Sequence, residues 1–102
     1  MGSSFPTRAS PLVETVAHTR LVNSAGLHAR PCHAIVSAAL RYPCELEVSS
    51  GGRTVSGRSI LELMTLCAPC EAELDFRARG PGAADLVGEL VLLVERGFGE
   101  LP

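Results

Sequence analysis

The sequence predicts an α+β fold, an open-faced sandwich in which three helices cover one face of a four-stranded, mostly antiparallel sheet. Segments with the two-residue alternation of strands and segments with the spacing of amphipathic helices follow one another in the order βαββαβα. The chain has 102 residues, enough for one small domain. We expect residues 1–12 to be a flexible N-terminal extension, because they show no apolar periodicity, and residues 13–100 to form the domain.

The first strand and helix are expected on either side of a polar turn. Residues 13–22 are rich in β-branched side chains, which favours a strand, and residues 23–26 (Asn-Ser-Ala-Gly) are typical of a turn. Apolar residues then recur at helical spacing from Ala29 to Leu40, so a helix is predicted from near His28 to Arg41. Pro43 is expected to end it.

A hairpin and a short helix are expected next. Residues 44–49 alternate between apolar and polar side chains, the turn at 50–52 contains two glycines, and residues 53–55 return as a short strand. Ser59 stands three residues before Glu62, the spacing of a capping box, in which each side chain accepts the other residue's backbone N–H. The helix that follows is predicted to reach Cys67, before Pro69.

The last strand and helix have the clearest patterns. Residues 71–79 alternate charged and apolar side chains, which predicts a half-buried strand, and Gly80-Pro81-Gly82 predicts a turn. Apolar residues from Ala83 to Val94 have helical spacing, and Gly97 suits a helix end.

Composition excludes several classes of function. The net charge is −2 and the nine basic residues are scattered, so we expect no nucleic-acid partner. No apolar run reaches the roughly 18 residues that a membrane span needs, and the first residues do not resemble a signal peptide. We therefore expect a cytoplasmic protein that does not insert into membranes and whose four cysteines are thiols.

The candidate chemistry lies at the start of the first predicted helix. In Gly26-Leu27-His28-Ala29-Arg30-Pro31, an imidazole and a guanidinium flank a helix N-terminus, where free backbone N–H groups attract anions. A phosphoryl group on His28 would be held by these N–H groups and by Arg30. Taken alone, the segment also fits a turn histidine and a solvated arginine. His18 and His33 have no such surroundings, and we expect them to be structural.

Two motifs resemble those of the HPr phosphocarrier family. Residues 26–31 resemble its active-site signature, and residues 57–66 (Gly-Arg-Ser-Ile-Leu-Glu-Leu-Met-Thr-Leu) resemble its second signature. The ending Gly97-Phe98-Gly99-Glu100 is also common in that family. The resemblance covers nearly the whole predicted domain, and its expected fold is the one derived above.

The resemblance implies a function and roles for individual residues. His28 would accept a phosphoryl group on Nδ1 from phosphorylated enzyme I, which draws on phosphoenolpyruvate, and Arg30 would stabilise it. The group would pass to an enzyme IIA-type acceptor of a phosphotransferase system. Ser59 would be a regulatory position for a serine kinase, and Ile60, Leu61 and Met64 would form the docking surface for partners. We expect a monomer that needs no cofactor or metal.

Two departures from the family pattern leave alternatives open. Cys32 and His33 add two reactive groups where the family usually has a small residue first, and Glu71 stands where it usually has glycine. One alternative is a regulator that signals through its phosphorylation state. Another is a thiol redox or metal-binding protein that uses Cys67 and Cys70, although their C-x-x-C spacing falls at a predicted helix end, where thiolates are not stabilised.

Overall fold

The computed structural model describes residues 14–100, and the predicted extension at 1–12 lies outside them together with Val13. The elements in chain order are β1 (Glu14–Arg20), α1 (Ala29–Ala39), β2 (Glu45–Ser50), β3 (Arg53–Ser56), α2 (Ile60–Met64), β4 (Glu73–Arg79), α3 (Ala83–Glu95) and the 3₁₀ turn η2 (Gly97–Gly99). The order βαββαβα is the predicted one. No helix within residues 14–100 is long and apolar enough to cross a membrane.

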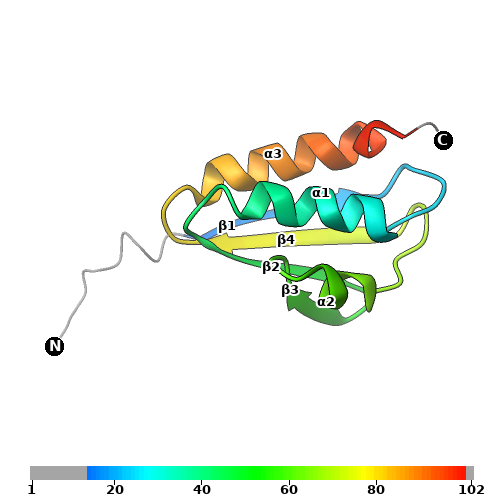
Figure 1. The fold of residues 1–102 in the computed structure, drawn as a ribbon, viewed down its shortest axis with the longest axis horizontal. Coiled ribbons are helices and arrows are strands. Elements are labelled where there is room, and N and C mark those ends of the chain that lie inside the picture. The colour runs from blue at the N-terminus through cyan, green and yellow to red at the C-terminus, as the bar shows by residue number, and fades with distance from the viewer. Residues whose placement is uncertain (1–13, 101–102) are drawn as a thin grey trace, which may run out of the picture.

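The four strands form one sheet in the order β1-β4-β2-β3, and every neighbouring pair is antiparallel. β4 lies between β1 and β2, so that Ala78 is opposite Thr15 on one side and Leu46 on the other. The helices lie on the same side of the sheet (Figure 1). The predicted open-faced α+β sandwich is therefore confirmed, and the sheet is wholly antiparallel.

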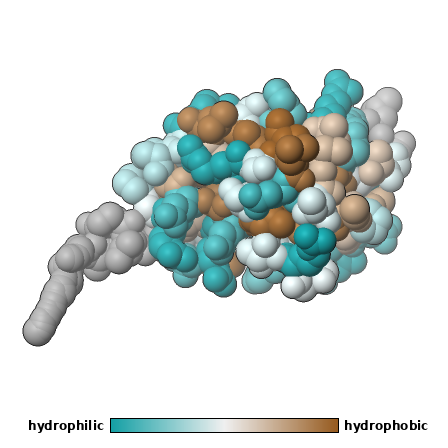
Figure 2. All heavy atoms as spheres, turned by 60° about the horizontal axis from the view of Figure 1, so that its bottom comes forward, coloured by the Kyte–Doolittle hydropathy of each residue, from teal (hydrophilic) through white to brown (hydrophobic). Residues whose placement is uncertain are grey.

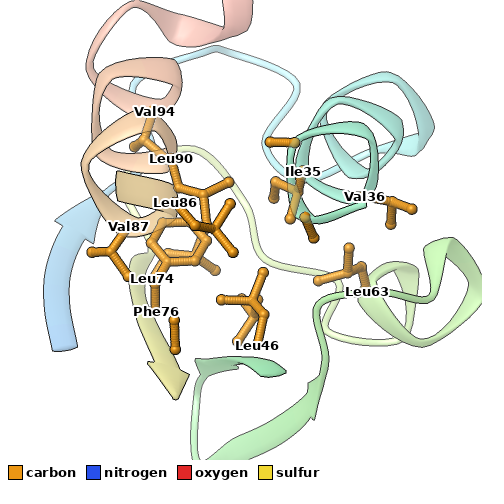
Figure 3. Close-up of a cluster of buried hydrophobic side chains, with 14 of the residues drawn as sticks. Ile35, Val36, Leu46, Leu63, Leu74, Phe76, Leu86, Val87, Leu90 and Val94 are labelled. Carbon is orange, nitrogen blue, oxygen red and sulfur yellow. The ribbon is translucent and has the colours of Figure 1, made fainter. Parts of the chain in front are cut away.

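The core fills the space between the sheet and the helices (Figure 3). Leu74, Phe76 and Ala78 of β4 are fully buried, as the alternation in that strand predicts. Leu86 and Leu90 of α3 pack over them, and the first helix contributes Ile35. Each large apolar side chain buried in this way contributes about 1.5–3 kcal/mol, so the two-layer arrangement follows from the pattern of apolar residues.

The other face of the sheet is polar. Glu14 and Glu45 flank Arg79 from the two neighbouring strands, and Glu14 Oε2 lies 3.3 Å from Nε of Arg77. Exposed pairs of this kind contribute about 0–1 kcal/mol each. This face therefore adds little to stability, and the helical side holds the fold together.

Two helices end earlier than predicted. α1 stops at Ala39 instead of Arg41, and Nη1 of Arg58 donates hydrogen bonds to the backbone carbonyls that follow the helix, those of Ala39, Tyr42 and Cys44. α2 stops at Met64 because the backbone soon turns away, and Cys67 has a positive φ of 49°. An α-helix cannot continue through that conformation.

The strands β1 and β4 are also shorter than predicted, and the reason lies at Glu71. Glu71 has a φ of 73°, in the left-handed region that favours glycine, which costs a non-glycine residue about 1–2 kcal/mol. Its N–H donates to the carbonyl of Leu21, while the N–H of Leu21 donates to Ala72. This irregular pairing replaces the regular ladder, so β4 begins at Glu73 instead of residue 71.

Candidate functional site

His28 is the residue immediately before α1. Its backbone is extended, with φ −92° and ψ −169°, and its carbonyl accepts the first hydrogen bond of the helix, from the N–H of Cys32. The N–H groups of Ala29 and Arg30 have no acceptor inside the helix at these positions, and Pro31 has no N–H. Two free donors therefore follow the imidazole, at the end of a helix that attracts anions.

The imidazole of His28 is oriented by the carboxylate of a residue that lies 72 positions later in the sequence. Nε2 of His28 lies 2.9 Å from Oε2 of Glu100, whose side chain is only 15% exposed, against 40% for His28. An ionised carboxylate can only accept a hydrogen bond, so Nε2 is the donor. In the neutral ring Nδ1 then carries the lone pair, and no hydrogen bond to Nδ1 is formed within residues 14–100.

Asn23 connects this pair to the turn before α1. Its side chain is 1% exposed, and Nδ2 donates to the carbonyl of Gly26 at 2.7 Å and to Oε1 of Glu100 at 3.0 Å. Oδ1 of Asn23 is buried without a hydrogen-bond partner among the described residues. One amide thus fixes both the loop that carries His28 and the carboxylate that orients it.

The same turn depends on glycine at position 26. Gly26 has a φ of 68°, and a Cβ atom there would lie 2.4 Å from the carbonyl oxygen of Ala68. That oxygen accepts the N–H of Leu27 at 2.8 Å. Any side chain at position 26 would push the loop off the segment after α2, so the motif's glycine is a steric requirement.

Arg30 is exposed on the first turn of α1. Its guanidinium forms no hydrogen bond or ion pair with any residue from 14 to 100, so it is available to an external anion. The structure thus brings the predicted His28 and Arg30 to one helix end. The sequence analysis did not identify Asn23 or Glu100 as site residues. The C-terminal motif of residues 97–100, which is common in the family, was the one signal that could have pointed to Glu100.

Ser59 caps α2, as the S-x-x-E spacing predicts. Its Oγ accepts the N–H of Glu62 at 3.2 Å. The reciprocal bond is different from the prediction, because Oε1 of Glu62 accepts the N–H of Ser56 at 3.0 Å instead of that of Ser59. The glutamate therefore ties the helix to the end of β3.

Known proteins that are similar to this chain share one family. The family model described as "PTS HPr component phosphorylation site" matches residues 16–96. The phosphocarrier protein HPr of Chlamydia muridarum is 34% identical over 79 residues, which is 78% of this chain and 76% of the relative. That of Treponema pallidum is 33% identical over 89 residues, 87% of this chain and 98% of the relative.

A solved structure extends the similarity to three dimensions. The HPr of Thermoanaerobacter tengcongensis superposes with a TM-score of 0.82 at 27% identity, over 86% of this chain and 99% of the other. The chain belongs to the HPr family. It is a phosphocarrier protein of the phosphotransferase system.

The predicted docking residues of this HPr-type chain differ in exposure. Leu61 is 79% exposed and Met64 is 41% exposed, whereas Ile60 is half-buried against the core. Leu40, which follows α1, is 63% exposed. Figure 2, which turns the lower side of Figure 1 toward the viewer, shows apolar side chains in several areas between polar ones. Leu61 and Met64 are thus the predicted docking residues that are open to a partner.

Cys32, which departs from the HPr pattern, is not a second reactive group at the site. The side chain is fully buried in the core, 3.8 Å from the carbonyl of Leu27, and burial raises the pKa of the Cys32 thiol from 9.0 to about 11. The group is a protonated thiol at neutral pH and packs as a small apolar side chain. His33 is exposed, with Nδ1 3.5 Å from Oγ of Ser37.

The second pair of cysteines, predicted at the end of the short helix, lies after α2 and does not begin a helix. Cys67 is exposed and its Sγ lies 3.5 Å from the carbonyl of Met64, while Cys70 is half-buried. Among residues 14–100, no three His, Cys, Asp or Glu side chains are grouped so that they could hold a metal ion. No observation in the described part of the chain favours thiol or metal chemistry there.

The raised pKa of the Cys32 thiol predicts that the folded protein loses stability at alkaline pH. Between pH 9 and about 11 the unfolded chain releases the Cys32 proton while the folded chain keeps it, so the free energy of unfolding falls as the pH rises. The slope contributed by this thiol is at most about 1.4 kcal/mol per pH unit.

Urea unfolding at several pH values between 8 and 11 measures this slope. Cys32→Ala should unfold at lower urea at pH 8, since it leaves a small cavity, and its stability should depend less on alkali than that of the parent. Cys67→Ala retains Cys32 and serves as the control. Equal alkaline slopes for Cys32→Ala and Cys67→Ala would show that Cys32 does not cause the loss.

Proposed function

We propose that Nδ1 of His28 carries the phosphoryl group, which it receives from phosphorylated enzyme I and gives to an enzyme IIA-type acceptor. The observation that supports this most directly is the hydrogen bond from Nε2 of His28 to Glu100. It leaves Nδ1 as the unprotonated nitrogen of a neutral ring, and only that nitrogen can act as a nucleophile.

Each group of the site has a task in the transfer. The lone pair of Nδ1 forms a bond to phosphorus while the bond between phosphorus and the donor breaks, so no proton has to leave the ring. As the ring gains positive charge, the carboxylate of Glu100 stabilises the Nε2–H group. The N–H groups of Ala29 and Arg30 and the guanidinium of Arg30 would donate hydrogen bonds to the negative oxygens of the phosphoryl group.

One copy of the chain holds the whole site, so a monomer is sufficient for transfer. Leu61 and Met64 give partners an apolar surface, on the helix that packs beside α1. Family membership also supports cytoplasmic partners, with phosphoenolpyruvate as the source of the phosphoryl group.

The proposal predicts a single modified residue. Incubation with enzyme I and phosphoenolpyruvate should add one acid-labile phosphoryl group, measured by intact mass, and His28→Ala should abolish it. Arg30→Lys should slow transfer about tenfold, because a lysine keeps the charge but not the planar fork that binds two phosphoryl oxygens.

His33→Ala is the matched control, because it removes the other imidazole of α1, which is exposed. It should accept phosphate like the parent. Labelling of His28→Ala, or loss of labelling in His33→Ala alone, would contradict the assignment to His28. Equal transfer rates for Arg30→Lys and the parent would exclude Arg30 from the transfer step.

We also propose that Ser59 is a regulatory site for a serine kinase. Ser59 is half-buried beside the exposed Leu61, so a phosphate there would add negative charge next to the docking surface. Glu62, which already places a carboxylate in the first turn of α2, opposes a phosphate on Ser59 through like-charge repulsion. A regulatory effect therefore has to be separated from the capping role of Ser59.

Two substitutions separate them. Ser59→Ala should lower the free energy of unfolding by about 1 kcal/mol through loss of the cap, and leave transfer unchanged. Ser59→Asp should melt like the parent, because aspartate caps as well as serine, but accept phosphate from enzyme I several-fold more slowly. Unchanged transfer by a stably folded Ser59→Asp would leave Ser59 as a helix cap alone.

A further inference from the structure

We propose that Arg58 is a positioning residue for phosphoryl transfer, because its side chain fixes α2 against the end of α1. α2 carries Leu61 and Met64, the docking surface for enzyme I, so the inference rests on the proposed function. Arg58 lies two residues before α2 and makes its contacts at the opposite end of α1 from His28. It therefore acts on the transfer through docking and not through the reacting atoms.

One nitrogen of Arg58 binds three carbonyl groups. Nη1 lies 3.1 Å from the backbone oxygens of Ala39 and Cys44, and 3.3 Å from that of Tyr42. Ala39 is the last residue of α1, where carbonyl groups lack partners inside the helix and the helix dipole is negative. α1 has no basic residue of its own in its last turn. Arg58 therefore supplies the cation that this helix end lacks.

The backbone next to Arg58 is fixed to the sheet. The N–H of Gly57 donates to the carbonyl of Leu46 at 2.9 Å, and a Cβ atom on Gly57 would lie 2.3 Å from the side chain of Leu46. The N–H of Arg58 donates to Oγ of Ser56 at 3.1 Å. The guanidinium thus reaches α1 from an anchored position, and it joins the sheet, the start of α2 and the end of α1.

α2 is too short to hold its position alone. It has five residues, of which Leu63 is the buried one, whereas isolated helices shorter than about 12 residues are marginal in water. α2 lies beside α1 (Figure 1) and packs against it. After the C-terminal end of α2, the carbonyl of Ala68 accepts the N–H of Leu27 at 2.8 Å. Arg58 makes the corresponding connection before the N-terminal end of α2.

These two connections determine how the docking surface lies relative to His28. Leu27, which makes one connection, directly precedes His28, and Arg58 makes the other beyond the last turn of α1. Leu61 is the second residue of α2, so its position depends most on Arg58. Without Arg58, an enzyme I molecule docked on Leu61 would meet His28 in a range of positions. Binding to a surface that is not held in one arrangement is weaker, while the chemistry at His28 stays the same.

Hydrogen exchange of the free protein tests the structural part of the proposal. Arg58→Gln keeps a polar side chain that is too short to reach the carbonyls. The amide of Leu63, which donates to the carbonyl of Ser59 across α2, should then exchange at least tenfold faster, relative to the amides of β4. Arg79→Gln is the matched control, because Arg79 is an arginine on the helix-free face of the sheet, paired with Glu14. It should leave this ratio unchanged, and an unchanged ratio in a folded Arg58→Gln would overturn the proposal.

Steady-state phosphorylation by enzyme I and phosphoenolpyruvate, with this chain as the varied substrate, tests the functional part. Arg58→Gln should raise KM about tenfold and keep kcat within about twofold of the parent, because His28 keeps its own partners. Arg58→Lys should return KM to within about threefold of the parent, since one nitrogen of Arg58 makes all three contacts and a lysine ammonium also donates to several acceptors. A lower kcat with an unchanged KM, or an Arg58→Lys protein with the KM of Arg58→Gln, would contradict the proposal.

A double-mutant cycle separates positioning from direct contact between the Arg58 cation and enzyme I. Leu61→Ala removes a docking side chain and should itself raise KM. If Arg58 acts through Leu61, Arg58→Gln/Leu61→Ala should raise KM no more than about twofold beyond Leu61→Ala alone. Effects on KM that multiply would overturn the proposal. A parent chain that accepts no phosphate on His28 would instead overturn the proposed function, because the exchange measurement requires no enzyme I.

Discussion

The geometry of the site depends on the buried amide of Asn23. Its Nδ2 donates to the loop that precedes α1 and to the carboxylate of Glu100, so two parts of the chain that are 77 residues apart are held by one side chain. Loss of this amide would leave Oε1 of Glu100 without its donor, which costs about 1–3 kcal/mol for a buried group left unpaired, while the Gly26 carbonyl would keep only the N–H of His28. His28 would then lose the partner that fixes its ring.

This arrangement assigns the two ring nitrogens of His28 to different roles. Nε2 is bound by the protein through Glu100, whereas Nδ1 and the guanidinium of Arg30 form no hydrogen bond with the described residues. The protein therefore contributes orientation, and the phosphoryl group of a partner supplies the missing contacts. Cys32 packs the first turn of α1 against the core as a protonated, buried thiol. It therefore does not compete with His28 as a nucleophile.

The fold and part of the site could be predicted from the sequence because local periodicity determines them. The alternation over β4, the glycine before His28 and the serine before α2 each act within a few residues. The pair of His28 and Glu100 could not be derived in this way, since 72 residues separate the partners and only the fold brings them together. The hydrogen bond from the N–H of Ser56 to the carboxylate of Glu62 was missed for a related reason, because it depends on the path of the chain between β3 and α2.

Nitrogen NMR of the imidazole of His28, recorded at a pH where the ring is neutral, tests the central claim most directly. The account predicts that the parent protein holds the tautomer with a proton on Nε2 and none on Nδ1, and that Glu100→Ala shifts His28 toward a mixture of the two tautomers. A proton on Nδ1 in the parent, or the same tautomer population in Glu100→Ala, would contradict the account.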